Sequence, residues 1–139
     1  MATYLMDVDG TLGATWNIAG TAESWETGGG TPPIKLDVAL IAANSTEEVP
    51  VGARISIVEY IVTTPYDNSA TLPTKIDGTS DLTLPTLPAT ATAVAGTYKY
   101  QAGWTVGSGQ NGPLNIAPTG TPTAGACTVI LHYARTTVA

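Results

Sequence analysis

The sequence contains no phenylalanine, one histidine and one cysteine, and only 12 % of its 139 residues are charged. Cys127 has no partner for an intrachain disulfide, and a metal site built on two cysteines is excluded. Five Lys and Arg residues stand against eleven Asp and Glu residues, a net charge of −6, so no basic surface for nucleic acid or an anionic membrane is expected.

Long hydrophobic runs and a secretory signal are also missing from the sequence, so neither a membrane span nor export is expected. The sequence therefore predicts a protein made in the cytoplasm, without disulfides, cofactors, a nucleic-acid partner or a membrane partner.

The remaining composition favours β-structure. Apolar residues make up 43 % of the chain, and threonine, glycine, alanine and proline replace the long charged residues that usually cover helices. Threonine favours strands, while glycine and proline favour turns. We expect an all-β protein, a β-sandwich or jelly roll with six to eight strands and an extended N-terminal arm.

A glycine-rich and proline-rich break divides the chain into three parts. Residues 28–33 (GGGTPP) predict a linker between an arm, residues 1–27, and a β-sandwich domain, residues 34–139. The arm has two candidate strands, Thr3–Met6 and Thr15–Ile18. Its apolar residues are the candidate partner-binding set: Tyr4, Leu5, Met6, Leu12, Trp16, Ile18 and Trp25.

Within the domain, alternating apolar and polar residues predict strands. They are expected at Ile34–Leu40, Arg54–Thr64, Leu72–Ile76, Leu82–Leu84, Tyr98–Val106 and Cys127–Ala134. The second is instead predicted from its β-branched residues and is apolar on both faces, so it is expected to be central. The third and fourth, flanked by prolines, are expected to be edge strands. One helical turn at Asn44–Val49 and long loops at Thr86–Thr92 and Pro113–Gly125 complete the prediction. The residues expected to share one core are Tyr98, Tyr100, Trp104, Val129, Leu131 and Tyr133.

Two short motifs suggest enzymes, but their surroundings do not fit. Asp7-Val-Asp9-Gly10-Thr11 resembles the opening motif of haloacid-dehalogenase phosphatases, which also need later acidic residues for magnesium and an α/β fold. No acidic residue follows Asp81, so an Asp-Gly turn between short strands explains the motif better. The G-x-G-x-x-G at residues 107–112 leads into a proline rather than a helix and predicts a loop.

The remaining candidate site residues also lack partners. His132 is expected in mid-strand, with Cys127 on the opposite face because five residues separate them. Asp67, Asp77 and Asp81 match no calcium loop and are expected to be solvated turn residues. The arm's Trp25, between two glutamates, fits either a carbohydrate contact or docking on a partner. We expect no catalytic site, no metal site and no enzyme activity.

Three segments of the domain resemble a known family. Val49–Val58 has an apolar-Pro-x-Gly-Ala entry into a strand, Ile76–Asp81 has an Ile-x-Gly-Thr hairpin, and Thr121–Ala134 has a Thr-rich turn before a strand that ends in tyrosine. In this order they are similar to small β-sandwich decoration proteins of tailed-phage heads, over roughly residues 34 to 135. The resemblance does not extend to the N-terminal arm.

The resemblance implies a capsid decoration or cement protein that binds the exterior of a phage capsid and stabilises contacts between capsomers. Its implied partners are the major capsid protein and other copies of itself, as a homotrimer. The alternative is a carbohydrate- or receptor-binding β-module of a phage tail or fibre, for which Trp16, Trp25 and Trp104 are the candidate sugar-stacking residues.

Overall fold

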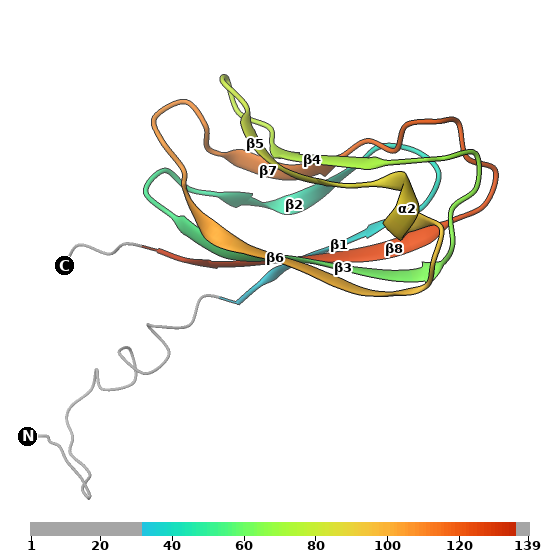
Figure 1. The fold of residues 1–139 in the computed structure, drawn as a ribbon. Helices are drawn as coiled ribbons and strands as arrows, with labels where there is room; N and C mark the ends of the chain where they lie inside the picture. The colour runs from blue at the N-terminus through green and yellow to red at the C-terminus, as the bar shows by residue number, and fades with distance from the viewer. Residues whose placement is uncertain (1–31, 136–139) are drawn as a thin grey trace, which may run out of the picture. The chain divides into compact units, whose positions relative to one another are not determined.

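A computed structural model describes residues 32–135, which form two antiparallel sheets packed face to face (Figure 1). The strands in this range are β1 (Ile34–Val38), β2 (Ala43–Val49), β3 (Arg54–Thr64), β4 (Leu72–Ile76), β5 (Leu82–Leu87), β6 (Gly96–Thr105), β7 (Gly112–Ile116) and β8 (Ala126–Ala134), with a short helix α2 (Ala89–Thr92) between β5 and β6. The two candidate arm strands and the seven apolar arm residues lie outside the described residues.

Each sheet has four strands. The first sheet has the order β1-β8-β3-β6 and the second has the order β2-β7-β4-β5. The predicted all-β sandwich is therefore confirmed. Within residues 32–135, no helix is long and apolar enough to span a membrane.

Period-two alternation places the core between the sheets. In β1, Ile34, Leu36 and Val38 are buried while Lys35 and Asp37 are exposed. Successive side chains of a strand point to opposite faces, so one face of each strand supplies the core. The fully buried side chains of the core include Ile55, Val58, Tyr60, Leu72, Ile76, Leu87, Leu114, Ile116, Val129 and Leu131.

Tyr60 joins the two sheets through a buried polar contact. Its side chain is fully buried, and its hydroxyl lies 2.6 Å from both Thr74 Oγ1 and the Pro85 carbonyl oxygen. Because the carbonyl only accepts, the Tyr60 hydroxyl donates to Pro85 and accepts from Thr74. Burial raises the pKa of the Tyr60 phenol, so it remains protonated and able to donate.

The core-face prediction is confirmed, with one difference in burial. Val129 and Leu131 are fully buried, whereas Tyr98, Tyr100, Trp104 and Tyr133 are half-buried and pack against the core. Three of these four aromatic residues belong to β6, which lies at the edge of the first sheet. An edge strand has a neighbour on one side only, so its side chains are covered less completely.

Two predictions failed in the same place. The segment expected to be a helical turn is β2, and the expected long loop from Pro113 contains β7, its hydrogen-bonded neighbour. The helical turn was expected because Ser45 and Glu48 fit a capping box. Instead, the hydroxyl of Ser45 accepts a hydrogen bond from Leu114 N and donates to the Glu47 carbonyl. The backbone N–H of Leu114, on the neighbouring strand β7, therefore takes the place of the helical N–H group that a capping serine would bind.

The other boundaries differ less. β4 was expected at an edge but lies between β7 and β5, and the pairing with β5 shifts register between Leu72 and Thr74, beside Pro73. Proline donates no ladder hydrogen bond, so this irregularity accommodates it. β5 is an edge strand, as predicted, but it continues to Leu87, and α2 takes up most of the expected Thr86–Thr92 loop.

Candidate functional site

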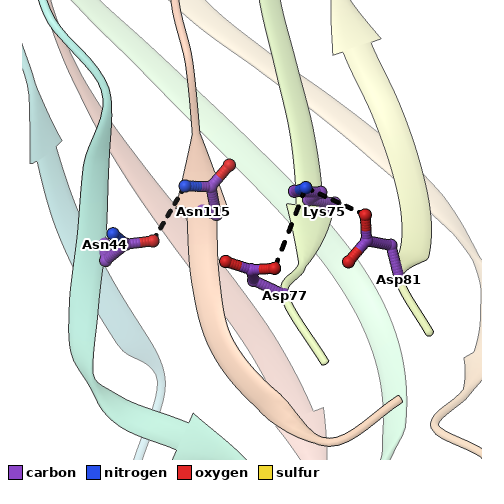
Figure 2. A network of polar contacts seen from close by, with 5 residues as sticks. All are labelled: Asn44, Lys75, Asp77, Asp81 and Asn115. Carbon is purple, nitrogen blue, oxygen red and sulfur yellow. Dashed lines mark hydrogen bonds and ion pairs between the residues drawn. The ribbon is translucent and has the colours of Figure 1, made fainter. Parts of the chain in front are cut away.

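The outer face of the second sheet carries a row of polar side chains from three strands (Figure 2). Asn115 of β7 donates from Nδ2 to Asn44 Oδ1 of β2 over 2.8 Å. On β4, Lys75 Nζ lies 2.9 Å from Asp81 Oδ2 and 3.8 Å from Asp77 Oδ1. The hydrogen bond to Asp81 raises the pKa of Lys75, so this amine stays charged and is not a candidate base.

A groove of about 320 Å³ lies on this sheet beside Lys75. Its lining residues are Pro73, Thr74, Lys75, Thr83, Thr86, Asn115 and Ala117. The volume is at the lower limit for small-molecule sites, and the lining offers threonine hydroxyls, an amide and one paired cation. These groups can hydrogen-bond a polar ligand, but they include no nucleophile paired with a base. Thr83, Thr86 and Asn115 were not predicted, because no sequence motif marks a groove formed across three strands.

A second groove of about 280 Å³ lies at the end of the first sheet, beside β1 and β8. There the Thr128 hydroxyl donates to Asp37 Oδ1 over 2.9 Å, and Cys127 lies in the wall. Burial raises the pKa of the Cys127 thiol to about 12, so the reactive thiolate is suppressed.

His132 and Cys127 lie on opposite faces of β8, as predicted. Cys127 is on the core side, while His132 Nε2 lies 3.2 Å from Glu59 Oε1 on the outer face of the first sheet. The imidazole of His132 contacts the Glu59 carboxylate, and the Ser56 hydroxyl donates to the His132 backbone carbonyl over 3.4 Å rather than to the ring. Among residues 32–135, the structure therefore builds no nucleophile–base pair around this histidine.

The three candidate calcium ligands are not brought together. Asp77 and Asp81 flank Lys75, whereas Asp67 joins two loops. Its carboxylate accepts hydrogen bonds from the Thr123 hydroxyl and from the backbone N–H groups of Thr123 and Ala124. These hydrogen bonds lower the pKa of Asp67. Within residues 32–135, no group of three or more His, Cys, Asp and Glu residues is placed to hold a metal ion.

Residues 107–111 of the glycine-rich segment form a loop, as predicted, whereas Gly112 begins β7. The Gln110 side chain closes it by accepting from Gly107 N over 2.8 Å, and Ser80 N donates to the Gly109 carbonyl over 2.8 Å. A Cβ at Gly78 would lie 2.5 Å from the Gly109 oxygen, so glycine permits this close approach. The loop packs on the β4–β5 hairpin and is not a phosphate-binding turn before a helix.

The free edge of β6 is the third surface of interest. Its half-buried aromatic residues, Tyr98, Tyr100 and Trp104, point toward the core side, and Lys99 is exposed on the other face. Pairing with β3 is regular from Gly96 to Gln101 and shifts register before Trp104. The strand alternation was visible in the sequence, but the open edge was not, because strand order depends on distant pairings.

No protein-family model and no curated protein sequence matches the chain. A chain with a similar fold occurs in the acidic stable capsid structure of Helicobacter pylori bacteriophage KHP30. The alignment has 13 % sequence identity and a TM-score of 0.55, and it covers 73 % of this chain and 85 % of that chain. At this level of identity, the similarity shows a common fold.

Proposed function

We propose that this protein is a structural component of a phage virion, a decoration or cement protein that binds the outside of the capsid and stabilises contacts between capsomers. The observation that carries the proposal is the fold shared with a chain of a phage capsid structure over 85 % of that chain. The proposed partners are the major capsid protein and further copies of this chain, as a homotrimer.

The surfaces of the sandwich suit this role. Residues 32–135 offer sheet faces, two shallow grooves and an open strand edge, and some of the ionisable side chains are held in local pairs, namely Lys75 with Asp77 and Asp81, and Glu59 with His132. On a symmetric shell, repeated weak contacts add up to tight binding. The proposed anchor is the set of apolar residues within residues 1–27, which includes Trp16 and Trp25.

One observation favours the alternative, a carbohydrate- or receptor-binding module of a tail or fibre. The groove beside Lys75 has hydroxyl and amide groups that can hydrogen-bond a sugar. However, Trp104, one of the candidate stacking residues, packs against the core and does not line that groove. We therefore favour the capsid role, and substitutions in the groove serve as controls in its test.

The test measures binding to heads that were assembled without this protein. Full-length protein should sediment with the heads to a fixed stoichiometry and raise the temperature at which they release DNA. A Trp16→Ala/Trp25→Ala variant should bind more weakly. Ile41→Ala, which removes an apolar side chain that is 78 % exposed on the sandwich, is the matched control and should bind normally.

A glycan array separates the two functions. Failure to bind heads, together with glycan binding that Lys75→Ala or Asn115→Ala abolishes, would refute the capsid role. Normal head binding by both groove variants supports it, because the groove has no part in the proposed contact.

A further inference from the structure

Four strands lie at the edges of the two sheets formed by residues 32–135, and three of them are poorly suited to pairing with another chain. β5 contains Pro85, and β2 has a register shift and two glutamates. β1 has only five residues and follows Pro32-Pro33. Prolines, bulges, charges and short length are the features that protect sheet edges.

The edge of β6 has few of these features. The strand is ten residues long, contains no proline and pairs regularly with β3 from Gly96 to Gln101. Its free edge can therefore accept an extended segment by backbone hydrogen bonding, as in β-strand addition. A partner strand would also cover the exposed parts of Tyr98 and Tyr100.

The charge on β6 limits what that partner can be. Lys99 lies opposite Glu59 in the register, but the Glu59 carboxylate contacts His132, and Lys99 forms no ion pair within residues 32–135. Two β6 strands pairing about a two-fold axis near Lys99 would place like charges side by side, which is destabilising. The edge therefore favours an acidic strand over a second β6.

The N-terminal part of the chain has the required charge. All five Lys and Arg residues lie between residues 35 and 135, whereas residues 1–31 contain four acidic residues and no Lys or Arg. Within residues 3–9 (TYLMDVD), Tyr4, Met6 and Val8 alternate with Leu5, Asp7 and Asp9. In a strand, this pattern puts three apolar side chains on one face and two carboxylates on the other.

We propose that residues 3–9 of a second copy of this chain add a strand to the edge of β6. Asp7 then lies beside Lys99 on the outer face, and Met6 and Val8 lie beside Tyr98 and Tyr100 on the core face. A single register therefore places Asp7 beside Lys99 and, at the same time, Met6 and Val8 beside the two tyrosines. This assigns a role to the Asp-x-Asp segment that resembles a phosphatase motif.

We take the occupant to be a second copy of this chain, in line with the self-association in the proposed function. The chain enters the first sheet through β1, and β6 lies at its opposite edge, beyond β8 and β3. Each protomer would give its N-terminal strand to the next and receive one at β6. Head-to-tail contacts of this kind form a closed ring when the rotation between neighbours is one third of a turn, which is the symmetry of the proposed homotrimer. The inference gives the self-association in the proposed function a structural basis, and its test uses purified protein without heads.

Disulfide trapping tests the contact. Full-length Asp7→Cys and Lys99→Cys proteins, distinguishable by mass, are mixed and oxidised gently. Cys127 is buried with a raised pKa and should not react. We expect a mixed disulfide between the two variants, because paired strands bring their Cβ atoms within bonding range. The matched control is Lys35→Cys, an exposed lysine in β1 at the opposite edge of the same sheet. It should give little mixed product with Asp7→Cys.

Charge reversal gives a second readout. In sedimentation velocity experiments, Lys99→Glu should weaken self-association about two- to tenfold, and Asp7→Lys in the same chain should restore it. Lys35→Glu should have no effect. Equal trapping at positions 35 and 99, or a wild-type protein that is monomeric at all concentrations, would overturn the proposal. Because no heads are present, these outcomes are independent of capsid binding.

Discussion

The buried hydroxyl of Tyr60 gives the clearest test of how the two sheets are held together. Tyr60→Phe keeps the ring, which makes an edge-to-face contact with Tyr100 at 5.8 Å between centroids. It removes the hydroxyl that donates to the Pro85 carbonyl and accepts from Thr74, both over 2.6 Å. The substitution therefore changes only the polar link between β3 and the second sheet.

The free energy of unfolding that Tyr60→Phe loses depends on which polar groups lose their hydrogen-bond partner. The Thr74 hydroxyl keeps an alternative acceptor, the Leu72 carbonyl at 3.2 Å, but the Pro85 carbonyl loses its buried donor. The Tyr60–Pro85 hydrogen bond is only partly buried, so its loss should lower the free energy of unfolding by about 0.5–1.5 kcal/mol. Each 1 kcal/mol corresponds to roughly 4–8 °C in the melting temperature of a domain of this size.

Urea unfolding monitored by circular dichroism measures this cost. Tyr98→Phe is the matched control, because the Tyr98 hydroxyl donates to the Val94 carbonyl over 2.8 Å at an exposed position. It should lower the free energy of unfolding by less than about 0.5 kcal/mol. If Tyr60→Phe costs no more than Tyr98→Phe, the hydroxyl of Tyr60 does not link the sheets as described.

Three further substitutions test other parts of the sandwich. Leu131→Ala, at a fully buried position, should lower the free energy of unfolding by about 2–5 kcal/mol in the same assay, and a cost below about 0.5 kcal/mol would contradict its place in the core. Gly125→Ala should lower the melting temperature because the new Cβ would lie 2.2 Å from the ring of Tyr66, whereas Gly103→Ala meets nothing closer than 3.6 Å and should not. Asp67→Asn should destabilise the protein above about pH 4, where the unfolded carboxyl is ionised. Because the pKa of Asp67 is lowered in the folded protein, the loss in free energy of unfolding relative to wild type should shrink as the pH falls through that pKa. A loss that is independent of pH between about 2 and 7 would contradict this role.

The sequence predicted those strands whose own residues carry the signal. β1 and β8 alternate apolar and polar side chains over most of their length, so their positions and buried faces were predicted correctly. The position of β3 was predicted from its β-branched residues, which are apolar on both faces and did not mark the core face. β2 and β7 were missed because polar and turn-forming residues such as Ser45 and Pro113 dominate them. Their strand structure depends on pairing with each other, and such long-range contacts leave no local pattern.

The candidate surfaces were less predictable than the fold. The separation of His132 from Cys127 followed from the strand period alone and is confirmed. The groove beside Lys75 and the open edge of β6 depend on strand order, which pairs residues far apart in the chain. The predicted binding role of the arm residues is untested and stays a prediction.

The most direct test of the capsid role is a cryo-electron-microscopy reconstruction of the virions that the source organism produces, beside virions from a deletion of this gene. The account predicts sandwich-shaped density on the outer capsid surface, at symmetry-related positions between capsomers, that disappears in the deletion. Unchanged capsid density in the deletion, or loss of density from a tail or fibre instead, would contradict it.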